Sequence, residues 1–232
     1  MKVVVITSGG LDSTVLLHHH HTGKRDEVRA LAIDYGQRHR RELGFAEINA
    51  TKLNVPFEVA NVKSLRDLLP GSSQTSSNVA VPHGRYDEES MKATVVPNRN
   101  MILLSIAIGH AIAHKFEAVS YAAHAGDHAI YPDCREEFVN ALEQAALLAD
   151  WIPIKIMRPF VHTTKAGIVK VGDGLGVNFL STYSCYEGGA IHCGKCGTCV
   201  ERIMAFKEAG VPDPTKYLDS DYWKHCVEPA KS

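Results

Sequence analysis

The sequence has no uninterrupted apolar run of about 18 residues, the length that a membrane-spanning helix needs. The short apolar run Val3–Ile6 is also too brief for a secretory signal peptide and is followed by no small-residue cleavage site. We therefore expect a cytoplasmic protein. Neither sign of charge is in excess, since 25 Lys and Arg stand against 26 Asp and Glu, for a formal net charge of -1. This balance argues against general binding to nucleic acid or to an anionic membrane.

Strands and helices are expected to alternate along the chain. Short β-branched or apolar runs predict strands, and apolar residues at helical spacing predict helices. The expected strands are Val3–Thr7, Val28–Asp34, Phe57–Val62 and Ala118–Ala123, and the expected helices are Leu11–His20, Arg38–Leu53, Asn98–Lys115, Cys134–Ala149, Thr164–Gly174 and Val200–Ala209. The alternation predicts an α/β fold in which a parallel sheet carries helices on both faces. The polar residues 70–90 predict a mobile loop.

The segment Ser8-Gly9-Gly10-Leu11-Asp12-Ser13 joins the first predicted strand to the first predicted helix. Glycines let the backbone approach an anion, and free amides at a helix N-terminus donate hydrogen bonds to phosphate oxygens. Ser8 and Ser13 add hydroxyl donors, and we expect Asp12 to handle a magnesium ion. The chain contains neither a G-x-x-x-x-G-K-S/T loop nor a G-x-G-x-x-G fingerprint. The segment instead resembles the PP-loop of the ATP pyrophosphatase superfamily, whose enzymes typically cleave ATP between its α- and β-phosphates.

Four of the six cysteines, Cys185, Cys193, Cys196 and Cys199, follow the spacing C-x7-C-x2-C-x2-C. Four thiolates supply the tetrahedral ligand set that structural zinc prefers, and clustering without an export signal favours metal over disulfides. An iron–sulfur cluster and a redox-active Cys-x-x-Cys pair are the alternatives. We expect residues 1–180 to form a nucleotide-binding domain and residues 181–232 a small zinc-binding segment with a polar tail. Cys134 is either a small buried hydrophobe or a site residue.

Four consecutive histidines, His18 to His21, do not predict a metal site. Neighbouring residues on a helix point about 100° apart, so their rings cannot converge on one ion. We expect them to form an exposed end of the first helix.

Five segments together resemble the 7-cyano-7-deazaguanine synthase family. They occur in the family's order and cover nearly the whole chain: Ser8–Ser13, Asp34–His39, Val96–Asn100, Tyr131–Arg135, and Ser184–Tyr186 leading to Cys193–Cys199. Each segment alone is a weak signal, whereas their order is specific.

The resemblance implies a PP-loop, Rossmann-like fold and an ATP-dependent ligase that forms C–N bonds in queuosine or other 7-deazapurine biosynthesis. ATP would adenylate the carboxylate of 7-carboxy-7-deazaguanine, and ammonia would displace AMP to give an amide. A second ATP would activate the amide oxygen, and loss of AMP would leave the nitrile. The implied cofactors are ATP, Mg²⁺ and Zn²⁺. The implied partners are small molecules and a second copy of the chain, with no direct nucleic acid and no membrane.

The resemblance also assigns roles to individual residues. The implied catalytic residues are Asp12, Ser13, Arg99 and Lys165. The implied ATP-binding residues are Thr7, Ser8, Gly9, Gly10, Leu11, Asp12, Ser13, Thr14, Val15, Leu16 and Leu17. The implied substrate-binding residues are Tyr35, Gln37, Arg38, Asp127, Asp133 and Arg135, and the implied metal ligands are Cys185, Cys193, Cys196 and Cys199.

Some of these roles have structural alternatives. Arg99 and Asn100 either hold phosphate or ribose or begin a helix as a cap and surface ion pair. Asp133 and Arg135 either contact the guanine-like edge and the carboxylate or cap the following helix. Many family members carry Ser-Gly before Tyr-Pro-Asp-Cys-Arg, whereas this chain has Asp127-His128-Ala129-Ile130. Substrate contacts near residues 127–130 are therefore less well defined.

The sequence leaves three alternatives to the synthase function. A PP-loop enzyme that thiolates tRNA would need a basic surface or an added RNA-binding domain, and the near-neutral chain shows neither. A family paralogue that conjugates a deazaguanine to a macromolecule remains an alternative. A non-enzymatic zinc-binding module would leave the nucleotide loop unexplained.

Overall fold

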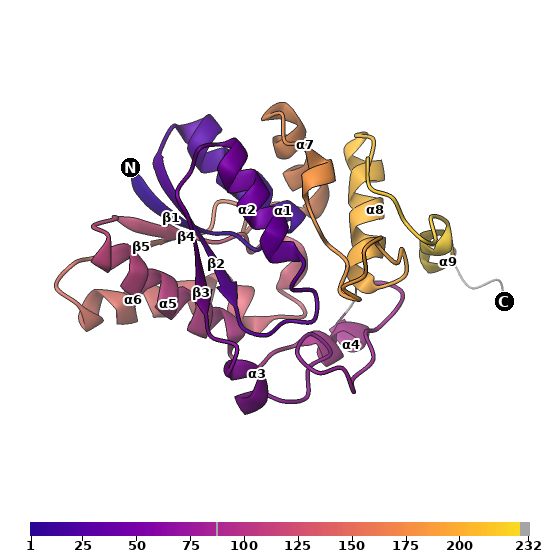
Figure 1. The fold of residues 1–232 in the computed structure, drawn as a ribbon, viewed down its shortest axis with the longest axis horizontal. Coiled ribbons are helices and arrows are strands. Elements are labelled where there is room, and N and C mark those ends of the chain that lie inside the picture. Colours follow the sequence, from indigo (N-terminus) through magenta and orange to yellow (C-terminus); the bar gives the residue numbers. More distant parts are fainter. Residues whose placement is uncertain (87, 228–232) are drawn as a thin grey trace.

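The computed structural model describes residues 1–86 and 88–227. At its centre lies a parallel five-stranded sheet, as Figure 1 shows. The strands are β1 (Lys2–Ile6), β2 (Glu27–Asp34), β3 (Phe57–Asn61), β4 (Ala118–Ser120) and β5 (Lys155–Met157), in the order β3-β2-β1-β4-β5. Val3 pairs with Val28 on one side and with Ala118 on the other, so β1 is central. The fold class predicted from the sequence is confirmed.

Helices cover both faces of the sheet. One face carries α1 (Leu11–His18), α2 (Glu42–Lys52), α7 (Lys165–Gly174) and α8 (Gly197–Ala209), and the other carries α5 (Arg99–Ala113) and α6 (Glu136–Ala149). Successive residues of a strand point to opposite faces, so Val3 and Val5 pack in the cluster with α1 and α7, whereas Val4 packs under α5. The sheet is buried on both sides, which is usual for parallel strands.

Shorter elements complete the described chain. They are α3 (Leu65–Leu68), α4 (Glu88–Met91), α9 (Tyr222–Val227), a π-helical turn at His19–Lys24, and 3-10 turns at Lys92–Thr94, Ala125–Asp127, Pro132–Cys134 and Phe179–Ser181. Over the described residues, no helix combines the length and the apolar character that a membrane crossing needs.

The prediction that the four histidines form an exposed end of the first helix is wrong for His20, which is fully buried. Its ring bridges Asp26 through Nδ1 at 2.8 Å and the Ser120 hydroxyl of β4 through Nε2 at 2.9 Å. The π-helical turn places this one ring against the sheet, and a buried histidine of this kind is satisfied by its two partners.

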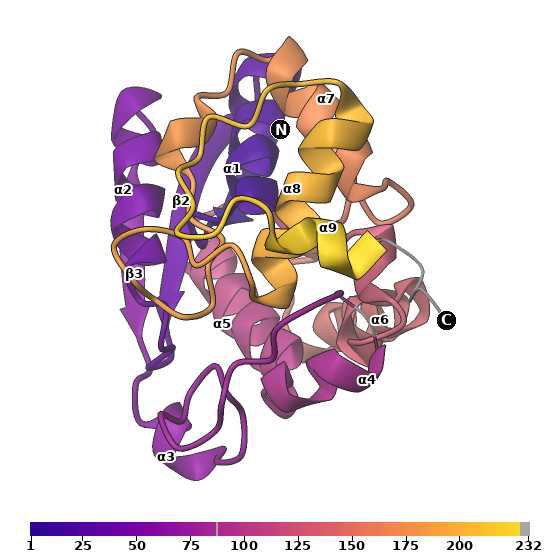
Figure 2. The ribbon, with the colours of Figure 1, turned by 90° about the vertical axis from the view of Figure 1, so that its right-hand side faces the viewer.

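Of the predicted segment 181–232, residues 181–227 are described, and they pack directly on the predicted domain 1–180; residues 228–232 lie outside the described residues. Helix α8 lies beside α7 in both views (Figures 1 and 2), and Ala205 and Phe206 share an apolar cluster with Val15 and Ile168. The division at residue 180 stays a prediction. The loop predicted over residues 70–90 is partly buried, since the run Ser72–Thr75 lies inside the protein.

Candidate active site

A cavity of about 240 Å³ opens at the carboxyl ends of β1, β2 and β4. Strands β2 and β3 lie on one side of β1, and strands β4 and β5 lie on its other side. The cavity therefore lies where the strand order reverses, which is a usual ligand site in open parallel sheets. Polar lining residues come from these strand ends, from α1 and α5, and from α7 and α8; they include Thr7, Ser8, Gly10, Asp12, Ser13, Tyr35, His39, Glu42, Gln74, Arg99, Tyr121, Asp127, Lys165, Thr198 and Glu201.

The loop from β1 to α1 is held in shape by its own serines. The Ser8 amide donates to Ser13 Oγ at 3.2 Å, and Ser13 Oγ donates to the Gly10 carbonyl at 3.2 Å. Among the described residues, no side chain caps α1 at Gly10. The backbone amides of the first turn of α1 therefore have no side-chain cap and remain free to donate hydrogen bonds at the cavity. The arrangement is suited to bind an anion.

Gly9 lets this loop lie directly against α2. Its φ is +86°, and a Cβ at this position would stand 2.1 Å from the Glu42 carbonyl oxygen and 2.6 Å from the Ala46 nitrogen. Both atoms are backbone, which cannot move aside without breaking α2. A residue with a side chain is therefore excluded here by both conformation and space.

Lys165 is the centre of a charged cluster on one wall. Its Nζ lies 2.5 Å from Asp12 Oδ2, 3.3 Å from Glu201 Oε2 and 3.4 Å from His124 Nε2. Burial alone would lower the pKa of Lys165, but Asp12 and Glu201 together raise it above its ordinary value. Burial raises the pKa of Glu201, against the opposing effect of Lys165. The lysine is thus a permanent cation between two carboxylates.

One oxygen of this cluster is unused. Asp12 Oδ1 is buried and accepts no hydrogen bond from any described residue. Asp127 and Glu201 add further carboxylates to the same lining, and oxygen donors of this kind suit a hard cation such as Mg²⁺. The residues present therefore fit a magnesium ion bound together with phosphates.

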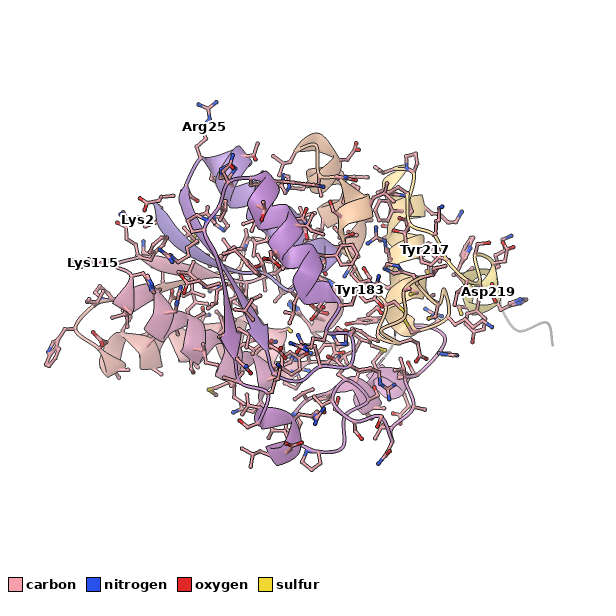
Figure 3. All side chains as sticks on the ribbon, in the orientation of Figure 1. Lys2, Arg25, Lys115, Tyr183, Tyr217 and Asp219 are labelled. Carbon is pink, nitrogen blue, oxygen red and sulfur yellow. The ribbon has the colours of Figure 1, made fainter. Side chains whose placement is uncertain are left out.

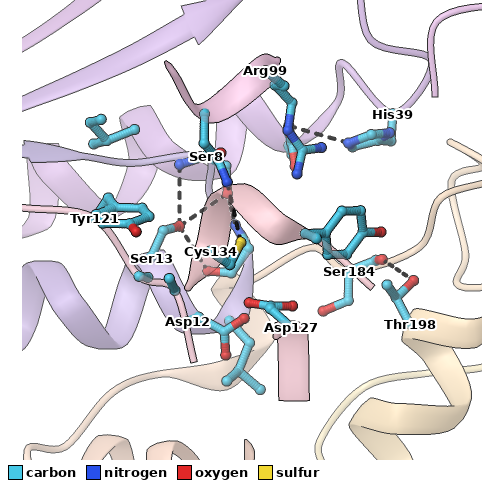
Figure 4. Close-up of a pocket in the computed structure, with 18 of the residues that line it drawn as sticks. Ser8, Asp12, Ser13, His39, Arg99, Tyr121, Asp127, Cys134, Ser184 and Thr198 are labelled. Carbon is cyan, nitrogen blue, oxygen red and sulfur yellow. Dashed lines mark hydrogen bonds and ion pairs between the residues drawn. The ribbon is translucent and has the colours of Figure 1, made fainter. Parts of the chain in front are cut away.

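The opposite wall carries Arg99, the first residue of α5 (Figure 4). Its Nη1 donates to Gln74 Oε1 at 2.8 Å, and its guanidinium lies 5.6 Å from the centre of the Tyr131 ring. The Tyr35 hydroxyl donates to the same Gln74 oxygen at 3.3 Å. Gln74 Nε2 is buried and has no hydrogen-bond partner within the described chain, so this wall also presents a free donor.

Glu42 and His39 lie buried beside Arg99. Gln37 Nε2 donates to Glu42 Oε1 at 3.2 Å, and His39 Nε2 lies 3.5 Å from the same oxygen. Burial raises the pKa of Glu42 to about 8 and lowers the pKa of His39 to about 3. Near neutral pH, the uncharged forms of both groups are favoured.

The four clustered cysteines form a compact group whose sulfur atoms all lie within 4.8 Å of one another. Cys193 Sγ and Cys199 Sγ are 3.9 Å apart, close to the ~3.8 Å edge of a tetrahedron with metal–sulfur bonds of ~2.3 Å. The amides of Lys195 and Cys196 donate to Cys193 Sγ at 3.3 and 3.2 Å. Hydrogen bonds from Cys185 first, then from the other two thiols and the Cys196 amide, lower the pKa of Cys193. The group can hold a metal ion.

Helix α8 connects this cysteine group to the cavity. Cys196 precedes its first residue and Cys199 lies in its first turn, while Thr198 and Glu201, three residues apart, line the cavity. Arg202, fully buried, donates to the Thr182 hydroxyl at 2.7 Å and pairs with Asp213 at 3.2 Å. One helix therefore carries both a member of the cysteine group and cavity-lining side chains.

Residues 2–210 match the family described as "Queuosine biosynthesis protein QueC". The chain belongs to this family. It is 50% identical over 229 residues to the 7-cyano-7-deazaguanine synthase of Rhizobium johnstonii, covering 98% of this chain and 96% of that protein. It is 49% identical over 230 residues to the 7-cyano-7-deazaguanine synthase of Ruegeria pomeroyi, covering 98% and 99%. The predicted family, an ATP-using ligase family, and its place in queuosine biosynthesis are confirmed.

Solved structures that resemble this QueC-family chain share its fold. The U34-tRNA thiolase NcsA of Methanococcus maripaludis aligns with a TM-score of 0.51 and 17% identity over 77% of this chain and 58% of that one. The NMN synthetase of Francisella tularensis aligns with a TM-score of 0.52 and 15% identity over 100% and 88%. At these identities the likeness concerns the fold alone.

The predicted ATP-binding segment of this QueC-family protein divides in two. Thr7, Ser8, Gly10, Leu11, Asp12 and Ser13 line the cavity, and Gly9 lies behind the loop against α2. Thr14, Val15, Leu16 and Leu17 are buried in α1 and are not among the lining residues. Of the predicted catalytic residues, Asp12, Ser13, Arg99 and Lys165 all meet at the cavity.

The predicted substrate residues are also split. Tyr35 and Asp127 line the cavity, whereas Gln37, Arg38, Asp133 and Arg135 are not among its lining residues. These four hold neighbouring backbone or side chains. Arg38 donates to the carbonyls of Ser76 and Val79 at 2.9 and 3.1 Å, and Arg135 Nε donates to the His128 carbonyl at 2.8 Å. Asp133 Oδ2 accepts the Asn100 amide at 2.9 Å, as a cap for the first turn of α5.

Sequence reasoning missed several lining residues. Glu201, Glu42, His39 and Gln74 were not predicted, although each is polar and lies in a largely buried stretch. For Glu201 and Thr198, one sequence feature could have indicated a place in the site, because both lie close to the predicted metal ligand Cys199 on the same predicted helical stretch. Gln74 had none, since it lies in the polar run assigned to a mobile loop.

Proposed function

We propose that this cavity converts 7-carboxy-7-deazaguanine and ammonia into 7-cyano-7-deazaguanine, with consumption of ATP. The observation that carries the proposal is the pairing of two walls: the serine-lined loop with Asp12 and Lys165 faces the half-buried cation Arg99 across one cavity. The first wall suits a triphosphate, and the second suits an anionic, planar substrate.

The proposed chemistry gives the substrate carboxylate a better leaving group. A carboxylate resists attack by ammonia because its oxygen leaves poorly, so a carboxylate oxygen first attacks the α-phosphorus and releases pyrophosphate. Ammonia then adds to the acyl carbon, AMP leaves, and a proton is lost to give the amide. The amide oxygen then attacks the α-phosphorus of a second ATP, which releases a second pyrophosphate, and loss of one N–H proton gives an adenylated imidate. Loss of AMP and of the remaining N–H proton gives the nitrile.

The residues of the first wall would act on the phosphates. Ser8, Ser13 and the first-turn amides of α1 would bind the pyrophosphate, and Lys165 would neutralise charge as it separates from AMP. We propose that Asp12, through its free Oδ1, would hold Mg²⁺, which would supply positive charge to stabilise the phosphates. Glu201 would keep Lys165 in place as its contact with Asp12 is exchanged for contact with phosphate.

The residues of the second wall would hold the deazaguanine. Arg99 lies in the cavity, whereas Arg135 binds a loop carbonyl, so we propose Arg99 as the guanidinium that meets the substrate carboxylate. Asp127 and the free Gln74 Nε2 supply an acceptor and a donor for polar ring edges. The role predicted for Arg135 then becomes that of shaping the loop 128–135.

We further propose that Cys185, Cys193, Cys196 and Cys199 hold Zn²⁺ as a structural ion. The sulfur spacing supports a single tetrahedral ion, and the amide donors support thiolate ligands. All six cysteines are free, which supports the proposed cytoplasmic location.

A homodimer is proposed as the assembled form. Leu148, in the last turn of α6, and Trp151, just after it, support the proposal, because they are 90% and 100% exposed and large exposed apolar side chains often mark a protein contact. Trp151→Arg should shift the sedimentation coefficient of a dimer to that of a monomer.

The test of the function is incubation with 7-carboxy-7-deazaguanine, Mg-ATP and ammonium chloride. Mass spectrometry should detect the nitrile, and chromatography should find AMP and pyrophosphate, with two AMP formed for each nitrile. ADP and phosphate as products would refute the proposal. An adenylate or amide that accumulates without nitrile would instead favour a paralogue that conjugates the deazaguanine to a partner.

A further inference from the structure

A second group of metal-ligating side chains lies away from the cavity. Glu58 of β3 and His110 and His114 of α5 bring one ligand atom each to within 4.8 Å of one another. His110 stands eleven residues after Arg99 on α5, a rise of about 16 Å along a helix axis. In Figure 3, Lys115 lies at one edge of the molecule, whereas the cavity-lining Tyr183 lies near its middle. The group is therefore separate from the active site.

The helix spacing brings the two rings onto one face. His110 and His114 are four residues apart, and their ring centroids lie 4.2 Å from each other at an interplanar angle of 36°. A histidine pair at this spacing on a helix is a known arrangement for binding one metal ion. Glu58 completes a two-nitrogen, one-oxygen ligand set from the adjoining edge strand.

The hydrogen bonds leave the required ring nitrogens available. His114 Nδ1 lies 2.9 Å from the His110 carbonyl oxygen, which can only accept, so Nδ1 carries the proton and Nε2 keeps its lone pair. Donation from the second ring nitrogen to a backbone carbonyl is the usual support of a metal-bound histidine. His110 Nε2 is buried and has no hydrogen-bond partner among the described residues. A buried nitrogen without a partner is costly unless a ligand occupies it.

One charged neighbour, Arg29, bears on whether the site can form. Arg29 contacts Glu58 through Nη1 and Oε1, and its guanidinium lies 5.8 Å from the centre of the Phe116 ring. The described residues form no hydrogen bond to Glu58 Oε2, which leaves one carboxylate oxygen for a metal.

We propose that Glu58, His110 and His114 form a second metal site, which binds a divalent transition-metal ion such as Zn²⁺. Water would complete the coordination, because the three ligands lie at the surface. A bound ion would tie the end of α5 to the edge strand β3.

The test is equilibrium dialysis of the full chain, with its cysteine group loaded, against micromolar zinc chloride. The wild-type protein should take up about one more zinc per chain than His110→Asn/His114→Asn, as counted by mass spectrometry of the metal. Glu58→Gln should weaken the extra binding by about tenfold or more. Added zinc should raise the melting temperature of the wild-type protein but not that of the double variant.

His18→Asn/His21→Asn is the matched control, because it removes two histidines of the consecutive run and leaves the proposed ligands intact. It should retain the extra zinc. Equal zinc uptake by the wild-type protein and the His110→Asn/His114→Asn variant would overturn the proposal, and so would loss of the extra zinc in the control. His114 is exposed, so the single variant His114→Asn gives the same comparison if the double variant does not fold.

Discussion

Lys165 and Glu201 form an ion pair, with Nζ and Oε2 3.3 Å apart, that joins the first residue of α7 to the second turn of α8. The pair couples the cysteine-bearing segment to the nucleotide loop, because the same lysine lies 2.5 Å from Asp12. Glu201 is thus one of the residues through which the carboxyl-terminal part of the chain reaches the cavity.

Glu201→Gln should reduce kcat/KM for ATP by about tenfold to a hundredfold, because a charge-assisted contact to a buried lysine is worth ~1.5–3 kcal/mol. Steady-state kinetics with varied ATP would measure it. The control Glu208→Gln changes an exposed carboxylate on the same helix and should leave the kinetics unchanged. An unchanged kcat/KM in Glu201→Gln, with the fold intact, would show that Asp12 alone positions Lys165.

The proposed roles of Arg99 and Arg135 can be distinguished by comparing the carboxylate and the amide as substrates of their variants. Arg99→Lys keeps the charge but loses the fork geometry, so it should impair turnover of the carboxylate more than turnover of the intermediate amide. Arg135→Lys should affect both substrates equally and mildly, since it binds a loop carbonyl. The measurement is kcat/KM for each substrate in each variant. The reverse pattern would return carboxylate recognition to Arg135.

Glu42 should make stability depend on pH. Burial raises its pKa from 4.5 to about 8, so the folded protein holds this proton more tightly than the unfolded chain does. Its favourable contribution is complete below pH 4.5 and is lost as pH rises towards 8. Glu42→Gln should therefore gain stability over the wild type across this range, by on the order of a few kcal/mol at its upper end.

Thermal unfolding of both proteins at a series of pH values measures this gain. The variant Glu47→Gln on the same helix is the control, because Glu47 is exposed and should show a constant difference. A gap between Glu42→Gln and the wild type that stays the same at every pH would contradict a buried, proton-holding Glu42.

Gly9 and Gly44 should respond oppositely to the same substitution. Gly9→Ala places a methyl group against the α2 backbone and should abolish ATP binding or folding. Gly44→Ala meets no atom within 4 Å and should stabilise α2 by roughly 0.5–1 kcal/mol. Calorimetric ATP binding and urea unfolding measure the two effects. Normal ATP binding by Gly9→Ala would mean that the loop does not pack as described.

Cys199→Ser should lose the bound metal and lower the melting temperature by roughly 10 °C, since several kcal/mol of metal-linked folding energy disappear. Cys226→Ser is the control, because Cys226 lies outside the cysteine group. Elemental analysis and thermal unfolding give the two readings. Iron with visible absorption in the wild-type protein would contradict the zinc proposal and indicate an iron–sulfur cluster.

The sheet and its covering helices were predictable because apolar runs encode burial on both faces. Val3–Ile6 and Val28–Ile33 could scarcely be anything but central strands. Strand β5 was missed because its three residues, Lys155–Met157, show no apolar run, and pairing with β4 alone makes them a strand. Helix α2 was predicted four residues too early, since Arg38 and its neighbours are held by the loop at Ser76 and Val79.

The site was predictable where chemistry sits in a local pattern and unpredictable where it depends on packing. The loop serines and the four cysteines lie close together in sequence, so their spacing carried the signal. Gln74 and Glu42 reach the cavity only because distant elements bring them together, and no local pattern marks a polar residue that will be buried. Arg135 and Asp133 share a segment with Cys134, which lines the cavity, but their own side chains turn to the loop and to α5.

The cavity draws on positions 13 and 201, which are 188 apart in the chain. During synthesis, the phosphate loop emerges well before Lys165, and Glu201, the carboxylate that restrains this lysine, emerges later still. A nascent chain therefore has an anion-binding loop long before it has a complete wall around it. Competence to turn over substrate should arrive late and all at once, when α8 docks, so that unfinished chains would not waste ATP.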